Sequence, residues 1–317
     1  MQTKSNVSAA VVVQMVLLGA IWGGAFTLIK VLVDGLSPIE IAVGRLLAGA
    51  LAVAIWLHVR GMLRVPPPAL LAPIALLAVL DTVAPYALVG WAESHIDSGA
   101  AAVLISTMPL FTVAFAAALL PSERAGGTKL AGVGIGFAGV LVMVGSPRTF
   151  TGSTLAGQLA VVGAASSYAL GALYARRLLT RIDAPNLVAS KLALGAAVAA
   201  VAMAGRGQGA ALLELSPSHA AALLTLGIVC TGISFVMYFR VVAVTGSVGG
   251  STVTYIIPAF GLLFGALFLG ETIEPRTIGG MALIAAGVAT VMYLPGIEQA
   301  AVWRRLRPAA AAQERCV

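Results

Sequence analysis

The chain carries the same sequence pattern twice, about 149 residues apart. Residues 98–120 reappear as residues 247–269, with Ser98 aligned to Ser247 and Pro109 to Pro258. The register continues on both sides of this segment. Each copy holds five apolar stretches, and an odd number of spans turns the second copy upside down in a bilayer. Inverted repeats that enclose a site near the middle of the membrane are typical of secondary transporters.

The composition indicates an integral membrane protein. Hydrophobic residues make up 60% of the chain and charged residues only 10%, whereas soluble domains carry roughly 25% charged residues. A transmembrane helix needs roughly 20 apolar residues. We therefore predict an all-α protein with ten transmembrane helices, as two inverted five-helix repeats, at residues 9–33, 38–60, 69–92, 99–121, 128–146, 154–176, 186–204, 218–242, 247–270 and 277–295.

The predicted repeats occupy residues 9–146 and 154–295, and residues 296–317 form a basic cytoplasmic tail. With the N-terminus in the cytoplasm, twelve Lys and Arg residues fall on the cytoplasmic side and four on the opposite side. This distribution follows the positive-inside rule and predicts that both termini are cytoplasmic. Topology and anionic lipid headgroups explain the net charge of +7, so we expect no nucleic-acid partner.

Three sequence features resemble the drug/metabolite transporter superfamily, and more specifically its EamA family. They are the first-span segment Trp22-Gly23-Gly24, the mid-span Pro258, and the Leu269-Gly270-Glu271 that follows it. The first copy departs from the last feature, because Leu120-Pro121-Ser122 precedes Glu123. Within the family the chain resembles the YddG type of aromatic amino acid exporter. The resemblance implies the ten-helix fold and the export of amino acids or other metabolites.

Pro109 and Pro258 are candidates for the wall of a central cavity. Each lies about eleven residues into its span, at equivalent points of the two repeats. A proline there frees a carbonyl group one turn earlier, which is tolerated only where protein or a watery cavity covers it. The alternative is a packing kink that contacts no ligand.

Arg45 and Lys191 are basic residues inside predicted spans, seven and six residues after the aligned Pro38 and Pro185. Ionisable residues inside a membrane are costly and mark functional sites by default. We expect the pair to hold a substrate carboxylate or to line the two vestibules. The alternative is snorkelling, or ion pairs with Glu40 or Asp183.

Asp81 is the acidic residue predicted to lie deep in a span, and it aligns with Cys230, while the next residue, Thr82, aligns with Thr231. Asp81 could relay protons, stay protonated, or pair with a base. Thr82 is a candidate cavity residue. Because the first and sixth spans carry no central carboxylate, we predict uniport driven by the substrate gradient.

Four aromatic residues near mid-span, Trp22, Tyr86, Tyr168 and Tyr255, are candidates for lining the pocket. Their rings would stack on an apolar, ring-bearing substrate, although packing between helices uses the same residues.

The sequence thus predicts a secondary transporter of the bacterial inner membrane that exports aromatic or large neutral amino acids by alternating access around a central cavity. A broader metabolite, drug or nucleobase-type exporter coupled to protons through Asp81 is the alternative, and a membrane scaffold is a third class. No phosphate-binding loop, nucleophile elbow or metal-ligand spacing occurs, so we expect no enzyme, metal or cofactor. The expected partners are a small-molecule substrate and the lipid bilayer, with no obligate protein partner.

Overall fold

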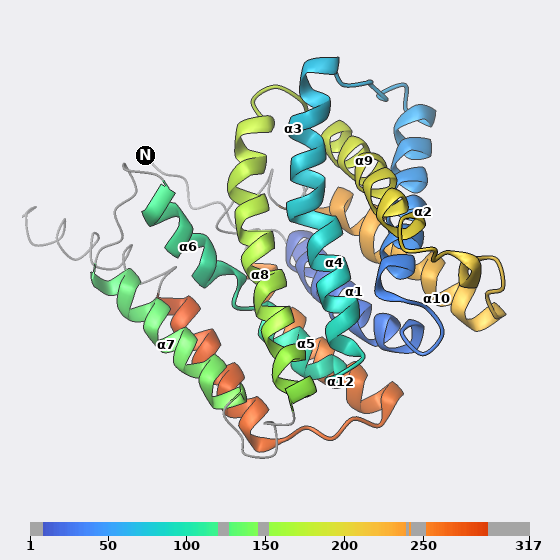
Figure 1. Ribbon diagram of the computed structural model, residues 1–317. Coiled ribbons are helices and arrows are strands. Elements are labelled where there is room, and N and C mark those ends of the chain that lie inside the picture. Colours follow the sequence, from blue (N-terminus) through green and yellow to red (C-terminus); the bar gives the residue numbers. More distant parts are fainter. Residues whose placement is uncertain (1–8, 120–126, 145–151, 239–240, 242–251, 291–317) are drawn as a thin grey trace, which may run out of the picture.

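All regular secondary structure in the described part of the chain is helical. The computed structural model describes residues 9–119, 127–144, 152–238, 241 and 252–290. Figure 1 shows the helices as a bundle of rods that run up and down between two ends. The helices are α1 (Ala9–Leu32), α2 (Pro38–Val59), α3 (Pro68–Ala78), α4 (Ala84–Glu93), α5 (Ser98–Ile105), α6 (Met108–Leu119), α7 (Gly127–Val144), α8 (Gly152–Leu178), α9 (Ala184–Ala204), α10 (Pro217–Gly227), α12 (Ile257–Leu269) and a last helix at 275–290.

Two spans pass through a wide π-helical turn instead of continuing as an α-helix. Val79–Val83 joins α3 to α4, and Ile228–Ile233 follows α10. Short 3₁₀ turns occur at Ala210–Leu212 and Thr252–Tyr255. The two π turns are at aligned positions of the sequence repeat, so the same backbone irregularity occurs twice.

Local sequence signals explain where several helices begin. Proline lies in the first turn of α2, α3, α9 and α10, where its missing N–H costs no hydrogen bond. The Asp183 carboxylate accepts a hydrogen bond from the N–H of Asn186 at 3.1 Å, and the Ser216 hydroxyl accepts one from the N–H of His219 at 3.2 Å. These caps satisfy amide groups that have no partner within the helix.

Seven helices are long and apolar enough to cross a membrane within the described residues. They are Val13–Leu32, Pro38–Val59, Pro68–Glu93, Ser98–Phe115, Thr154–Ala175, Ala184–Ala204 and Pro217–Tyr238. Ala131–Val142 and Ile257–Leu269 are shorter apolar helices. Large apolar side chains such as Val59 and Phe268 are exposed, at 77% and 71%, as expected of a surface that faces lipid. The count of ten spans stays a prediction.

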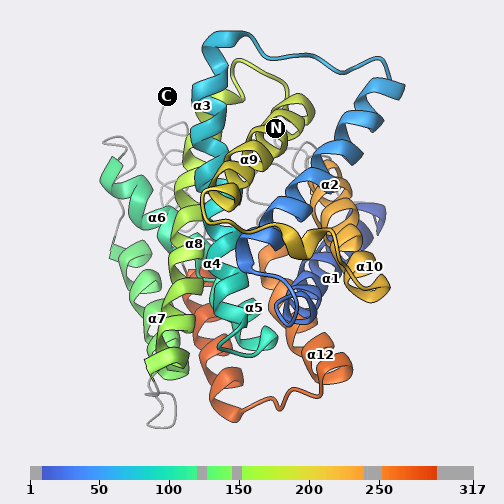
Figure 2. The ribbon, with the colours of Figure 1, turned by 45° about the vertical axis from the view of Figure 1, so that its right-hand side comes forward.

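The helices pack as pairs that are distant in sequence. α2 packs on α9, α1 on α12, and α4 on α8. Figure 2, turned by 45°, shows α2 and α9 crossing in front of the bundle, with α10 beside them. Segments from the two halves of the chain therefore interleave rather than form separate lobes.

Loops rich in arginine lie at one end of this bundle. The N–H of Arg64 donates a hydrogen bond to the Asn186 side chain at 2.8 Å, and Asn186 donates one to the carbonyl of Met62 at 3.0 Å. The α2–α3 loop, with Arg60 and Arg64, thus lies against the turn that follows Arg181. Figure 1 draws both connections at the top of the view.

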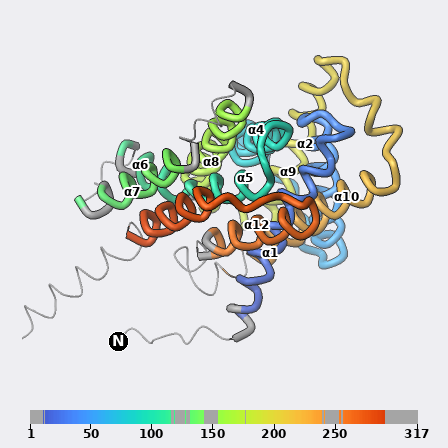
Figure 3. Tube along the Cα trace, turned by 90° about the horizontal axis from the view of Figure 1, so that it is seen from below, coloured from blue at the N-terminus to red at the C-terminus, as the bar shows by residue number. Residues whose placement is uncertain are grey.

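Glycines bring α7 and the helix at 275–290 into backbone contact. A Cβ added to Gly139 would lie 2.7 Å from the carbonyl oxygen of Gly280, and one added to Gly287 would lie 2.4 Å from the nitrogen of Gly136. Small residues at such contacts let membrane helices approach closely. Figures 1 and 3 show α7 and this last helix, in red, side by side along one flank of the molecule.

Candidate functional site

A cavity of about 380 Å³ lies in the middle of the bundle, among α1, α2, α8, α9 and the two π turns. Its size falls in the range of small-molecule sites, which span about 300–1,000 Å³. Its wall is mostly apolar, with a few polar and charged side chains. The lining residues are Trp22, Ala25, Phe26, Ile29, Arg45, Leu77, Asp81, Tyr86, Val89, Ile105, Ser106, Met108, Tyr168, Ala172, Ala175, Leu179, Leu187, Val188, Lys191, Cys230, Phe235, Tyr238, Thr254 and Ile257.

Two helix breaks form part of this wall. α5 ends at Ile105 and α6 begins at Met108, while a 3₁₀ turn precedes α12, which begins at Ile257. The predicted mid-helix prolines are instead at the starts of helices: Pro109 is the second residue of α6 and Pro258 the second of α12. Neither proline is among the lining residues, although Met108 and Ile257 beside them are.

Two hydroxyl groups add a second hydrogen bond to carbonyl groups at the first break, which also accept the backbone N–H groups of Ser106 and Thr107 at 3.1 Å. Ser106 donates to the carbonyl of Val103 at 2.6 Å, and Thr107 donates to that of Leu104 at 2.7 Å. An unsatisfied carbonyl would be costly at membrane depth. At this break beside the cavity, backbone and hydroxyl donors together satisfy both carbonyl groups.

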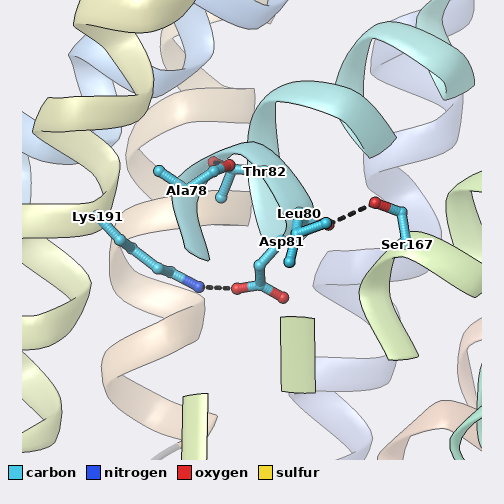
Figure 4. A network of polar contacts seen from close by, with 6 residues as sticks. All are labelled: Ala78, Leu80, Asp81, Thr82, Ser167 and Lys191. Carbon is cyan, nitrogen blue, oxygen red and sulfur yellow. Dashed lines mark hydrogen bonds and ion pairs between the residues drawn. The ribbon is translucent and has the colours of Figure 1, made fainter. Parts of the chain in front are cut away.

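Lys191 of α9 and Asp81 of the first π turn form an ion pair at the cavity wall (Figure 4). The Lys191 side chain is 5% exposed and that of Asp81 is 17% exposed. The hydroxyl of Ser167 donates to the carbonyl of Leu80 at 2.7 Å, which ties the π turn to α8. Of the three roles considered for Asp81, which were proton relay, a protonated side chain and pairing with a base, the structure shows the last.

The other carboxylates considered as partners are engaged elsewhere. Asp183 caps α9 through Asn186, so the suggested Lys191–Asp183 ion pair is not formed. Glu40 accepts hydrogen bonds from the N–H and hydroxyl of Ser37 and from the N–H of Gly209. The suggested ion pair of Glu40 with a buried base is likewise absent from the described residues.

Arg45 of α2 faces the same cavity but contacts no carboxylate among the described residues. Its Nε donates a hydrogen bond to the Thr231 hydroxyl at 2.7 Å. Its guanidinium carbon lies 3.8 Å from the centre of the Tyr86 ring, within the range of a cation–π interaction. Arg45 as a residue is only 8% exposed, so solvent screens its charge poorly.

Aromatic rings surround these charges. The Trp22 indole donates to Ser234 at 3.0 Å, and its ring centre lies 5.4 Å from that of Tyr238. The centres of the Tyr86 and Tyr168 rings are 6.5 Å apart. Edge-to-face and tilted contacts of this kind are the favourable arrangements of aromatic pairs.

The structure brings six of the ten sequence candidates together as cavity-lining residues: Trp22, Arg45, Asp81, Tyr86, Tyr168 and Lys191. Thr82 lies behind the wall, fully buried, with its hydroxyl bonded to the carbonyl of Ala78 at 2.5 Å. Tyr255 ends the turn Thr252–Tyr255, and its side chain is outside the described atoms.

Sequence reasoning missed several residues of the site. Phe26, Phe235 and Tyr238 line the cavity; the ring of Phe235 lies 4.2 Å from Lys191 Nζ. Phe235 and Tyr238 could have been found from the helical spacing that follows Thr231. Glu93 was also missed, because it ends α4, beyond the predicted span of 69–92. It is fully buried, and its carboxylate has no hydrogen-bond partner among the described residues.

A smaller polar hollow of about 200 Å³ lies at the end of the bundle opposite the arginine-rich loops, lined by Asp97, Gln158, Glu271 and others. Glu271 accepts hydrogen bonds from the N–H groups of Ser98 and Gly99 at 2.7 and 3.0 Å, so it caps α5. Partial desolvation and, next, the charge of Glu271 raise the pKa of Asp97, while Lys30 opposes the shift. Within the described ranges no three His, Cys, Asp or Glu side chains gather as metal ligands.

Several of the known proteins that are similar to this chain are named as transporters. The chain is 28% identical over 279 residues to a protein of Streptantibioticus cattleyicolor named "Probable terminal-alkyne amino-acid exporter", covering 87% of this chain and 91% of that one. It is 28% identical to the uncharacterized inner membrane transporter YedA of Escherichia coli, over 86% and 87% of the two chains. A crystal structure with 21% identity superposes with a TM-score of 0.63, over 90% of this chain and 98% of the other.

The sequence profile of the EamA-like transporter family matches residues 10–145 and 155–293, which is most of the chain. The family name and the names of the relatives indicate a transporter rather than an enzyme, with a small-molecule substrate and the lipid bilayer as partners. With its seven long apolar helices, the protein is a multi-pass protein of the inner membrane. The predicted resemblance is thereby confirmed at the family level: the chain belongs to the EamA-like transporter family.

Proposed function

We propose that the protein exports amino acids with aromatic or large neutral side chains across the inner membrane. The observation that carries the proposal is the central cavity, whose apolar and aromatic wall holds Arg45 and the Lys191–Asp81 pair. An apolar wall with a few fixed polar groups is the usual form of a site that orients a small ligand. Arg45, which contacts no carboxylate among the described residues, supplies a cation for the substrate carboxylate. Trp22, Tyr86 and Tyr168 supply rings for the substrate side chain.

The relatives support the amino acid class. One relative, 28% identical over most of both chains, is named as an amino-acid exporter. The rings of Trp22, Tyr86 and Tyr168 around the cavity favour aromatic side chains within that class.

The architecture proposed for this function is ten spans in two inverted repeats, at 9–146 and 154–295, with a cytoplasmic tail at 296–317. Reciprocal contacts support it. Gly132 and Gly139 align with Gly280 and Gly287, and they also meet each other: Gly139 contacts Gly280, and Gly287 contacts Gly132 and Gly136. Two equivalent helices that touch through the same residues are what a pseudo-two-fold axis in the membrane plane produces.

The arginine-rich end of the bundle supports cytoplasmic termini. The hydrogen bonds of Asn186 hold the loop with Arg60 and Arg64 against the turn after Arg181. Lys30 and Arg276 lie at the other end, among Asp97, Glu271 and Glu274. Under the positive-inside rule the arginine-rich end faces the cytoplasm.

Alternating access is the proposed mechanism, with the helix breaks near Pro109 and Pro258 as the flexible points. Discontinuous helices beside a central site are a recurring feature of secondary transporters. We propose uniport driven by the substrate gradient, since the Asp81 carboxylate is held in an ion pair with Lys191. Asp81 does line the cavity, and this favours as second candidate a proton-coupled exporter of broader metabolites.

The test is the flux of labelled phenylalanine and tryptophan into proteoliposomes of the purified protein, with a substrate gradient alone and with an imposed pH gradient. We expect flux with the substrate gradient alone, at a rate that the pH gradient leaves unchanged. Flux that needs the pH gradient would favour the proton-coupled candidate. Absence of flux in both conditions would refute the aromatic amino acid assignment.

A further inference from the structure

The cavity wall contains two equivalent contacts, each between a long helix of one half of the chain and a π turn of the other half. α2 packs against the π turn Ile228–Ile233, and α9 packs against the π turn Val79–Val83. The glycines at these contacts are equivalent: a Cβ on Gly49 would lie 3.1 Å from Thr231, and one on Gly195 would lie 3.0 Å from Thr82. In both helices a basic residue comes four positions before this glycine, Arg45 in α2 and Lys191 in α9.

One substitution distinguishes the two copies. In α9, Lys191 pairs with Asp81, the residue before Thr82. In α2, the residue before Thr231 is Cys230, so the position that would supply a carboxylate to Arg45 holds a thiol. Arg45 binds the Thr231 hydroxyl and the Tyr86 ring instead, and neither of these groups neutralises its charge.

The cavity wall therefore has an unbalanced charge. Among the described lining residues it holds two basic side chains, Arg45 and Lys191, and one acidic side chain, Asp81, so one base has no acidic counterpart. Glu93 is buried outside the lining. The charges of Lys30 and, less strongly, Arg45 act on it, but it forms no ion pair with Arg45 in the described residues. A poorly hydrated guanidinium is stabilised most by a planar carboxylate, to which it can donate two parallel hydrogen bonds.

We propose that Cys230 keeps Arg45 unneutralised, so that Arg45 alone receives the substrate carboxylate, and that the cavity accepts apolar monocarboxylates whether or not they carry an amino group. The inference rests on the proposed function for the identity of the site. In this inference Lys191 neutralises Asp81 and does not bind the substrate. Among the described lining residues the acidic one, Asp81, is thus already paired, so an α-ammonium group finds no free anion in this part of the wall.

Two nearly isosteric variants test the inference. Cys230→Asp supplies Arg45 with the carboxylate that Lys191 already has, whereas Cys230→Asn adds the same volume and polarity without charge. The measurement is the affinity of each purified protein for phenylalanine and for 3-phenylpropanoate, from the rise in melting temperature with ligand concentration. We expect both ligands to bind the Asp variant at least about 30-fold more weakly than the Asn variant, as for a strong charge-assisted contact.

A further variant covers the case in which Cys230→Asp does not fold. Arg45→Gln removes the guanidinium group that is proposed to bind the carboxylate, and it adds no buried charge. We expect it to bind both ligands about 30-fold or more weakly than the wild type. Equal affinity of the Asp and Asn variants, or unchanged affinity of Arg45→Gln, would overturn the inference. So would wild-type protein that binds phenylalanine but not 3-phenylpropanoate, or neither of them.

The proposed function is tested by a separate measurement, the flux of labelled phenylalanine through the wild-type protein. If the variants lose carboxylate binding but the wild type carries no flux, the inference stands and the export assignment fails. If the wild type carries flux and the variants bind as the wild type does, export stands and the role of Cys230 and Arg45 is wrong.

Discussion

Lys191→Met alone is expected to lower the free energy of unfolding by about 3–5 kcal/mol, the usual effect of removing one partner of a buried ion pair. The remaining Asp81 carboxyl group would lie at the cavity wall, 17% exposed and without its base. Asp81→Asn alone should destabilise similarly, because it leaves Lys191 unpaired at 5% exposure. The measurement is the melting temperature of each purified variant in detergent.

The double variant Asp81→Asn with Lys191→Met is the decisive comparison. It removes both charges together, and replacing a whole buried pair is often nearly neutral. We therefore expect it to melt above both single variants and to carry more phenylalanine flux than either. Glu274→Gln is the matched control, because Glu274 pairs with Arg276 while 51% exposed, and we expect it to change stability by about 1 kcal/mol or less. A double variant no more stable than the single ones would contradict the interpretation of the pair as a mutual neutraliser.

Gly287→Ala is expected to be strongly destabilising although it adds a single methyl group. That group would lie 2.4 Å from the nitrogen of Gly136 and 2.6 Å from the carbonyl oxygen of Gly132. Backbone atoms cannot rotate away as a side chain does, so α7 and the helix at 275–290 must separate. Overpacking costs typically about 1–3 kcal/mol and occasionally more, and we expect a value at or above the top of this range.

Gly279→Ala in the same helix is the control, because a Cβ at Gly279 would meet nothing within 4 Å. The two variants gain the same methyl group and the same helix propensity, so their difference in melting temperature isolates the helix contact. Equal melting temperatures would mean that α7 and the last helix do not meet through their glycines in the folded protein.

Much of the fold follows from the sequence, because membrane insertion imposes a simple rule. Each long apolar stretch must satisfy its backbone hydrogen bonds internally, and a helix is the solution. The positions of helices such as Pro38–Val59 and Ala184–Ala204 were predictable for this reason. The packing of α7 on the helix at 275–290 was not, because glycine spacing indicates a close contact without naming the partner.

The candidate site was predictable in part. Charged residues in apolar spans are rare, so Arg45, Asp81 and Lys191 could be singled out, and all three line the cavity. Their pairing could not, since Lys191 and Asp81 are 110 residues apart and meet only because α9 packs on a π turn. Neither π turn has a signature in the hydrophobic pattern. The helix breaks before Met108 and Ile257 could not be predicted from the sequence either. A proline that starts a helix and a proline that kinks one look alike in sequence.

Competition for labelled phenylalanine flux tests the central claim most directly, that the cavity of the wild-type protein recognises an apolar carboxylate. Excess 3-phenylpropanoate keeps the ring and the carboxylate, and excess 2-phenylethylamine keeps the ring and the amine. We predict that 3-phenylpropanoate lowers the flux about as far as unlabelled phenylalanine does, and that 2-phenylethylamine leaves it unchanged. Inhibition by the amine without inhibition by the carboxylate would contradict the account.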